Sequence, residues 1–587
     1  MWSDRGHLGK DVAVIEHYTA ARQELTGPGG QFALTRINVR GADTLAYAAA
    51  PPSMRFFWEL SAAHGDKDYL VYEDERYTYA QIHEQVRKVA AYLVAHGAGK
   101  DGRVAVSTRN YPEWVVAYWA TVSIGAALVG MNAWWTAPEM EYALNDSNPV
   151  VLIADDERLE RLAQTSPRPG MHVVSVRSDR MAGDNFATWA DILATTDPGT
   201  LPAVDIDPDD DATIFYTSGT TGFPKGAQLT NRGSVTNILN LVAMTSTTAL
   251  AEQKAIAAGD IPAPTASPVA APAQACFFAP TPLFHVTACN CILHPATVSG
   301  AKIVLMYKWD PGRALELIER EKVTSFSGVP TMSRELLLHP DWSKRDTSTL
   351  QGMGGGGAAL QPDLVGKIAD ALKGSGGQPS TGYGMTETHG IITANSARWF
   401  IAKPASCGPL VPTLEAKLVD EDGNDLQAGP DTVGILCVRG AVTIKGYLNR
   451  EDATSETIKD GWLNTGDVAR IDEDGFVYLV DRAKDMVIRG GENVYCSEVE
   501  TAIYAHPAIA EAAVFGVPDE RLGEEVAAAI VLQPGTSVSE DELRSFLSAS
   551  LARHKIPSKI WFREEQLPRN ANGKFLKREL RKELTGE

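Results

Sequence analysis

The sequence predicts an α/β fold in which mostly parallel sheets are covered by helices, followed by a small α+β domain at the C-terminus. Three observations lead to this prediction. Helical patterns alternate with short β-rich runs over most of the 587 residues, as in a parallel sheet with crossover helices. Near residue 410 the runs change to the pattern of antiparallel strands joined by Asp-Gly turns. About a hundred residues at the end then form a compact unit.

The alternation is clearest in the first half of the chain. Apolar residues at helical spacing predict a helix over Tyr79–His96, and Arg103–Thr108 follows it as a strand. Further β-rich runs predict strands at Val150–Ala154, Val173–Val176 and Lys302–Met306. Together these elements indicate a sheet whose faces are covered by helices.

One uncharged stretch, Trp114–Pro138, is long enough in principle to span a bilayer. Two glycines interrupt it, and a Pro-Glu pair just before it is typical of a helix start. A buried helix over Glu113–Ile124 and a short strand over Ala127–Gly130 explain it with two ordinary elements. We therefore expect no integral membrane association. The Ala/Pro-rich segment Ala251–Gln274 is predicted to be a surface loop.

The last third contains the antiparallel strands and the C-terminal unit. Asp-Gly turns are expected at Asp422-Gly423 and Asp474-Gly475. The predicted elements, in chain order, are strands Ala416–Val419, Ile435–Arg439 and Phe476–Leu479, helix Ser497–Ala505, strands Glu511–Val517 and Val526–Leu532, and helix Glu540–Leu551.

Composition excludes several classes of function. The chain has 54 Lys and Arg against 74 Asp and Glu, a net charge of −20, so nucleic acid is not an expected partner. Six cysteines without any CxxC pair argue against a zinc site and against a disulfide scaffold, and favour a reduced cytoplasm. The N-terminus lacks the apolar core of a secretory signal. We therefore expect a cytoplasmic location.

The most informative motif is YTSGTTGFPKGA, at Tyr216–Ala227. Its glycines let backbone N–H groups turn toward an anion, its hydroxyls add donors, and its lysine supplies positive charge. A Walker A loop needs Gly before the lysine and Ser or Thr after it, whereas Pro224 and Gly226 stand there, so a P-loop ATPase or kinase is disfavoured. The candidate anion-binding residues are Thr217, Ser218, Gly219, Thr220, Thr221 and Lys225.

With five further motifs, this one resembles the adenylate-forming superfamily of acyl-CoA synthetases, luciferases and peptide-synthetase adenylation domains. The five follow in the expected order: PTPLFHVTACN (280–290), GGGGAAL (354–360), STGYGMTET (380–388), the segment from Trp462 to Tyr495, and LPRNANGKFLKREL (567–580). The resemblance implies a two-step reaction. A carboxylate attacks the α-phosphate of MgATP and releases pyrophosphate, and a thiol then displaces AMP. No protein nucleophile is required.

The resemblance also implies the role of each site residue. Thr386 would contact the α-phosphate, Glu387 would hold Mg²⁺, and Lys574 would orient the carboxylate and the α-phosphate. His285 would border the acyl and thiol channels. The adenine would lie against Gly356, Gly357 and Ala358, and against Gly382, Tyr383 and Gly384. The ribose and phosphate would be held by Asp467 and Arg482, and the pantetheine tunnel lined by Gly490 and Gly491. ATP, Mg²⁺ and coenzyme A are thus the expected cofactors and co-substrates.

The family architecture implies three parts: a large domain over residues 1–480 that includes a distorted β-barrel, a hinge at 481–484, and a small mobile domain over 485–587. Lys484 matches the hinge position. Small apolar residues, Val286 and Val329 among them, favour a hydrophobic acid, either fatty, aryl or arylalkanoic. A homodimer is kept as a candidate assembly. The acid itself and the pathway are left open.

Three alternatives stay open at this point. An acyl-AMP ligase that loads a carrier protein would share every motif, although the chain ends seven residues after Leu580 and leaves no room for a carrier domain in cis. A nicotinamide or flavin oxidoreductase would explain the GxGxxG match at Gly352–Gly357, but no acidic residue lies about 20 positions further on. A non-catalytic binding protein on the same fold is the third.

Overall fold

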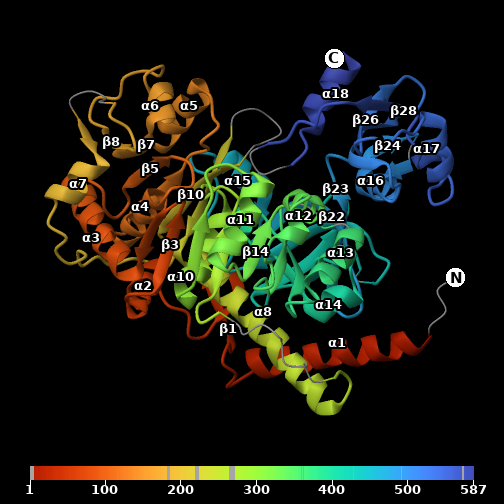
Figure 1. The fold of residues 1–587 in the computed structure, drawn as a ribbon, viewed down its shortest axis with the longest axis horizontal. Coiled ribbons are helices and arrows are strands. Elements are labelled where there is room, and N and C mark those ends of the chain that lie inside the picture. Colours follow the sequence, from red (N-terminus) through yellow and green to blue (C-terminus); the bar gives the residue numbers. More distant parts are fainter. Residues whose placement is uncertain are drawn as a thin grey trace.

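A computed structural model describes residues 5–180, 185–217, 224–262, 272–357, 360, 362–427, 429–490, 492–570 and 574–586. It confirms the α/β prediction (Figure 1). Two mostly parallel sheets with helices on their faces come first along the chain, an antiparallel sheet follows, and a separate sheet with its own helices ends the chain.

The first sheet has seven strands in the order β11-β10-β6-β5-β7-β8-β9, and only β10 and β11 run antiparallel to each other. Its strands are β5 Arg103–Ser107, β6 Ala127–Gly130, β7 Val151–Asp155, β8 His172–Val176, β9 Phe186–Thr188, β10 Asp211–Thr217 and β11 Lys225–Thr230. The helices of this part are α3 Tyr79–Ala95, α4 Pro112–Ser123, α5 Ala137–Ser147, α6 Asp156–Leu162 and α7 Trp189–Thr195.

The second sheet has eight strands in the order β17-β16-β15-β14-β12-β13-β3-β4, parallel except at β3/β4 and β16/β17. Its strands are β3 Asp68–Tyr72, β4 Glu75–Thr78, β12 Cys276–Ala279, β13 Lys302–Leu305, β14 Ser325–Gly328, β15 Gly352–Gly355, β16 Gln378–Tyr383 and β17 Thr393–Ser396. The helices that follow β11 along this part of the chain are α8 Asn231–Ala258, α9 Val286–Ala288, α10 His294–Ser299, α11 Pro311–Glu321, α12 Pro330–Leu338, α13 Pro362–Leu372 and α14 Ala397–Ala402, of which α8 contacts β10 and β11 of the first sheet.

The uncharged stretch of the sequence is a core helix and a core strand, as expected. Helix α4 contacts β5 and β6 of the first sheet and β3 of the second. Trp114, Tyr118 and Trp119 on this helix are fully buried in the largest apolar cluster, which joins both sheets. Among the described residues we find no helix with the length and hydropathy needed to cross a bilayer.

The loop prediction for Ala251–Gln274 is wrong in its first part. Residues 251–258 continue α8, which ends at Gly259 with φ of 80°. Alanine is the strongest helix former, and the first proline of the segment is Pro262, so nothing stops the helix earlier. The rest of the predicted loop lies largely at 263–271, outside the described residues.

The antiparallel part contains six strands, in the region for which the resemblance implies a distorted barrel. They run in the order β18-β23-β22-β20-β19, with β21 beside β22, and neighbours are antiparallel. Gly423 and Gly475 of the two Asp-Gly turns have positive φ, as predicted. The elements are β18 Gly408–Pro409, β19 Leu414–Val419, β20 Gly434–Gly440, α15 Glu451–Thr457, β21 Ile458–Lys459, β22 Trp462–Ile471 and β23 Phe476–Arg482.

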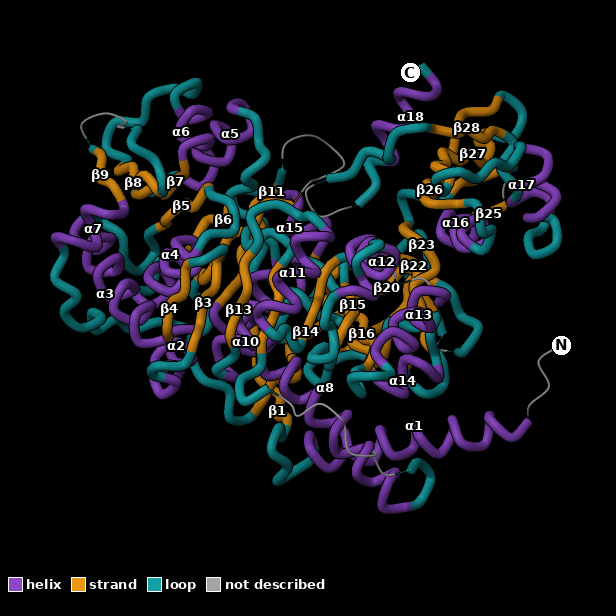
Figure 2. Tube along the Cα trace, in the orientation of Figure 1, coloured by secondary structure: helices purple, strands orange, loops and turns teal. Residues whose placement is uncertain are grey.

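The C-terminal unit lies beside the rest of the protein and follows directly after β23 (Figures 1 and 2). Its apolar clusters draw only on its own residues. Cys496, at the start of α16, is fully buried and its thiol donates a hydrogen bond to the Asp485 carbonyl at 3.0 Å. The elements are β24 Val487–Arg489, β25 Glu492–Val494, α16 Cys496–Tyr504, β26 Ile509–Asp519, β27 Gly523–Leu532, α17 Glu540–Leu547, β28 Lys559–Arg563 and α18 Lys577–Thr585.

The first sixty residues form elements that the sequence patterns did not predict. Helix α1 (Arg5–Thr26) packs against α8, and both extend along one end of the molecule (Figure 1). A hairpin follows, made of β1 (Leu34–Val39) and β2 (Ala42–Tyr47), and then α2 (Met54–Ser61). The hairpin contacts β20 of the antiparallel sheet and α8.

Candidate active site

The predicted site residues meet in one cleft of about 2210 Å³. It opens where β14, β15 and β16 end, because the carboxyl ends of parallel strands share one edge of a sheet. The described site residues that line it are Thr217, Lys225, His285, Gly356, Gly357, Gly382, Tyr383, Gly384, Thr386, Glu387, Asp467, Arg482 and Lys574. Ser218, Gly219, Thr220, Thr221, Ala358 and Gly491 lie outside the described residues.

Gly490 does not line this cleft. It sits between β24 and β25 with φ of 61°, and its N–H donates to the Leu522 carbonyl at 2.8 Å within the C-terminal unit. The expected contact of Gly490 with pantetheine stays a prediction.

The glycine run 352–357 is explained by strand packing. Gly352–Gly355 form β15 itself, and a Cβ atom on Gly354 would lie 1.8 Å from the Ser380 carbonyl oxygen of β16. A dinucleotide fingerprint would instead lie in the turn between a strand and a helix. The run thus brings β15 and β16 close together at the edge of the cleft, and nothing here favours the oxidoreductase alternative.

Tyr383, Asp467 and Arg482 converge on one carboxylate. The Tyr383 hydroxyl donates to Asp467 Oδ2 at 2.6 Å, and Arg482 Nε lies 3.5 Å from Asp467 Oδ1. Asp467 and Arg482 face each other in the pairing of β22 with β23, which explains their spacing of fifteen residues in the sequence. Burial and the Asp467 charge both raise the pKa of the Tyr383 phenol, so it stays a donor.

Glu387 is buried on the 3₁₀ helix Thr386–Thr388, where Thr386 is buried as well. The Tyr447 hydroxyl donates to Glu387 Oε1 at 2.7 Å, and Lys225 Nζ lies 5.1 Å from the centre of the Tyr447 ring. Burial raises the pKa of Glu387, while the Tyr447 hydrogen bond and the charges of Arg482 and Lys225 act against this rise. Sequence reasoning missed Tyr447, since a single tyrosine sixty residues away carries no signal of this contact.

Lys574 brings the C-terminal unit into the same site. Burial and repulsion by Arg482 lower the pKa of Lys574 to about 8, against the attraction of Asp467, Asp485 and Glu387. The backbone N–H of Lys574 donates to Asn570 Oδ1 at 3.0 Å. An ammonium group of the small domain is thus held near the carboxylates of the large domain, in a position where an anionic ligand would stabilise it.

His285 lines the cleft between Phe284 and Val286, which line it as well. Burial and, secondly, the charge of Lys574 lower its pKa to about 4, so the ring is neutral at physiological pH. Its Nδ1 accepts a hydrogen bond from the Thr287 N–H at 3.3 Å, which caps the short helix α9.

A magnesium ion fits this site only as a partner of bound phosphates. Within the described residues no three metal-ligating side chains gather in one place, and Glu387 is a buried carboxylate that lines the cleft next to Thr386. Mg²⁺ usually keeps waters and binds through one or two carboxylates plus substrate phosphates, which matches this donor set.

Comparison with known proteins gives consistent matches along the chain. Residues 57–448 match the sequence model for AMP-binding enzymes, and residues 498–574 match that for the AMP-binding enzyme C-terminal domain. The chain is 35% identical over 555 residues to a putative acyl-CoA synthetase, YngI, of Bacillus subtilis, which covers 90% of this chain and 96% of that protein. It is 34% identical over 508 residues to a feruloyl-CoA synthase of Amycolatopsis, covering 86% and 93%.

Solved structures agree with these matches. The anthranilate CoA ligase AuaEII, in complex with anthranoyl-AMP, superposes with a TM-score of 0.78 at 26% identity, covering 91% of this chain and 98% of that one. ATP-bound MatB from Rhodopseudomonas palustris superposes with a TM-score of 0.76 at 29% identity, covering 90% and 98%.

Proposed function

The chain belongs to the AMP-binding enzyme family, and from this premise we propose that it is an ATP-dependent acid–CoA ligase acting on a hydrophobic fatty, aryl or arylalkanoic acid. The observation that carries the proposal is the convergence of Lys574, Glu387 and Asp467 on one cleft from two domains. Relatives named as a long-chain-fatty-acid–CoA ligase, a feruloyl-CoA synthase and a 4-coumarate–CoA ligase support the reaction and the two kinds of acid.

In the first step the acid carboxylate attacks the α-phosphorus of ATP, the bond to the β-phosphate oxygen breaks, and pyrophosphate leaves. Two anions must approach each other, so the site needs positive charge and oriented donors. Lys574 supplies the charge for both anions, and Thr386 donates to the α-phosphate. Asp467, fixed by Tyr383, accepts from the ribose hydroxyls. Mg²⁺, when bound, neutralises phosphate charge, and Glu387 would hold it.

In the second step the thiol of coenzyme A attacks the acyl carbon and AMP leaves. His285 lines the cleft and its ring is neutral, so it can lie beside the acyl group or the thiol without placing a further positive charge next to either. Apolar side chains from several elements line the cleft, among them Phe277, Val286, Cys291, Val329, Ile391 and Trp399. This lining supports a hydrophobic acid in place of a small polar one.

The direct test is CoA-dependent release of AMP with a panel of fatty, aryl and arylalkanoic acids. We expect AMP release to require acid, ATP and CoA together. Pyrophosphate release without CoA-stimulated AMP release, for every acid in the panel, would instead favour an acyl-AMP ligase that loads a carrier protein. No AMP or pyrophosphate from any acid would favour a non-catalytic binding protein.

Two further parts of the proposal concern the cell. A cytoplasmic location is supported by the six cysteines, which are all free; fractionation of cells with an antibody to the protein tests it. The homodimer stays a prediction, and light scattering decides it by a mass near 63.2 kDa or near twice that value.

A further inference from the structure

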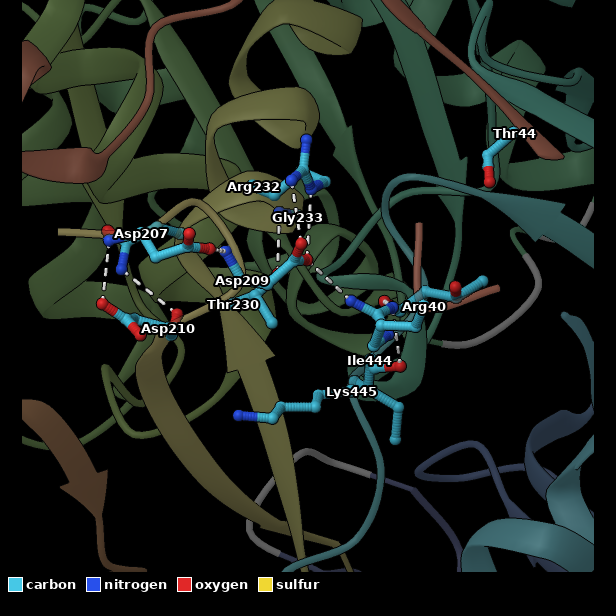
Figure 3. A network of polar contacts seen from close by, with 12 residues as sticks. Arg40, Thr44, Asp207, Asp209, Asp210, Thr230, Arg232, Gly233, Ile444 and Lys445 are labelled. Carbon is cyan, nitrogen blue, oxygen red and sulfur yellow. Dashed lines mark hydrogen bonds and ion pairs between the residues drawn. The ribbon is translucent and has the colours of Figure 1, made fainter. Parts of the chain in front are cut away.

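Arg40 stands at the tip of the β1–β2 hairpin, before the part of the chain that matches the family model. Val39 pairs with Ala42, so Arg40 and Gly41 form a two-residue turn, with φ of 48° and 89°. Positive φ at both positions is typical of the type I′ turn of tight hairpins. The turn directs the Arg40 side chain toward Asp209 and the segment at Thr443 and Ile444 (Figure 3).

The Arg40 guanidinium donates hydrogen bonds to a carboxylate through one nitrogen and to two backbone carbonyls through another. One nitrogen donates to Asp209 Oδ1 at 2.9 Å, and Arg232 holds the same carboxylate at 2.8 Å (Figure 3). The other nitrogen donates to the carbonyl oxygens of Thr443 and Ile444, at 3.0 and 3.2 Å. A planar guanidinium with several fixed donors can make all three contacts at once, which an ammonium group on a flexible stem does less well.

The loop that Arg40 holds reaches Glu387 in two ways. Ile444, whose carbonyl accepts from Arg40, donates its own N–H to the backbone carbonyl of Glu387 at 3.0 Å. Three residues later Tyr447 donates its hydroxyl to the Glu387 carboxylate at 2.7 Å. Arg40 is therefore one residue away from the backbone of Glu387, and one short loop away from its side chain.

We propose that Arg40 is a positioning residue for adenylation, which fixes the loop Gly440–Leu448 so that Ile444 and Tyr447 hold Glu387 in place for the magnesium–nucleotide complex. The inference rests on the proposed role of Glu387. Arg40 itself touches neither nucleotide nor acid.

The same hairpin offers a matched control. Arg36 on β1 also joins the hairpin to the rest of the large domain, through an ion pair with Glu415 of β19 at 2.7 Å, and it pairs with Asp43 of the hairpin itself at 2.8 Å. Neither of these two ion pairs of Arg36 involves the loop Gly440–Leu448. If Arg40 merely anchored the hairpin, loss of either arginine would have the same consequence.

The test measures equilibrium binding of α,β-methylene-ATP, which cannot form an adenylate, by calorimetry with and without Mg²⁺. For Arg40→Ala we expect the Mg²⁺-dependent gain in affinity to fall about three- to tenfold, the size of one lost hydrogen bond. Arg36→Ala should match the wild type within about twofold, since surface ion pairs contribute little. Arg40→Lys should lie between the wild type and Arg40→Ala. Equal losses in the two alanine variants would overturn the inference.

A double-mutant cycle adds a readout that a purely structural role would not move. Tyr447→Phe should also weaken Mg²⁺-dependent binding, and adding Arg40→Ala to it should cost less than it does in the wild type, because both act on Glu387. If the two losses of affinity simply multiply in the double variant, Arg40 and Tyr447 act independently and the inference that both act on Glu387 is refuted. A failure of the proposed function would look different from a failure of this inference, because in that case the wild type itself would show no Mg²⁺-dependent gain in affinity and no adenylation.

Discussion

Adenylation should depend on pH through Lys574, whose pKa burial and Arg482 lower from 10.5 to about 8. We take the protonated lysine to be the active form, because it faces two anions in the first step. For ATP, kcat/KM then falls as pH rises through 8, since this ratio reports the free enzyme. The protonated fraction is about nine tenths at pH 7 and about one tenth at pH 9, so we expect about a tenfold loss between them.

The lowered pKa of Lys574 also makes the stability of this arrangement depend on pH. Because the pKa in this arrangement lies below that of a free lysine, protonation disfavours the arrangement below about pH 8, and the cost vanishes above 10.5. A shift of this size corresponds to a cost of up to about 3 kcal/mol for the charged form. The negative charge of bound phosphates offsets this cost. ATP should therefore raise the melting temperature of the wild type more than that of Lys574→Met.

Two variants and two half-reactions make this a discriminating assay. Pyrophosphate release at pH 6–10 measures adenylation, and thioester formation from synthetic acyl-adenylate plus CoA measures the second step. Lys574→Arg should lose the alkaline limb, since a guanidinium is not deprotonated in this range. Lys574→Ala should lose adenylation by orders of magnitude and keep the second step. A limb near pH 8 that persists in Lys574→Arg, or equal loss of both half-reactions in Lys574→Ala, would refute the reasoning.

Three other variants test single contacts of the site. Glu387→Gln keeps the size of the side chain and removes its charge, so the Mg²⁺ concentration for half-maximal adenylation should rise about tenfold while the melting temperature changes little; an unchanged Mg²⁺ titration would contradict the role. Tyr383→Phe removes the hydroxyl that donates to Asp467 and should raise KM for ATP about tenfold, which is the size expected for losing a hydrogen bond to a charged group. An unchanged KM for ATP would show that Tyr383 is not needed to position Asp467. Lys484→Pro fixes φ near −65° at the proposed hinge, so acyl-AMP should still form while thioester formation falls by orders of magnitude and Lys484→Ala stays near wild type. Full thioester turnover by a folded proline variant would exclude this hinge.

Local patterns in the sequence were sufficient for most of the secondary structure. The strand over Ala127–Gly130 matches β6, and the helix over Tyr79–His96 matches α3 to within one residue. Hydrophobic period and turn residues act over a few neighbours, so they can be read from the chain directly. The last part of α8, residues 251–258, was missed because the loop prediction for the Ala/Pro-rich segment 251–274 was extended over alanines that precede its first proline, Pro262.

The candidate site, too, could be predicted from the sequence only in part. The residue types of the motif at 216–227 were enough to predict an anion-binding loop, and the resemblance of six motifs in order to the adenylate-forming superfamily implied the reaction. The hydrogen bond from Tyr447 to Glu387, the contact of Arg40 with Ile444 and the position of Gly490 outside the cleft could not be predicted before the fold was known. The physical reason is that these contacts join segments 60 and 404 residues apart, or depend on how two domains are placed. Such contacts follow from the packing of whole sheets, which no local pattern of residues records.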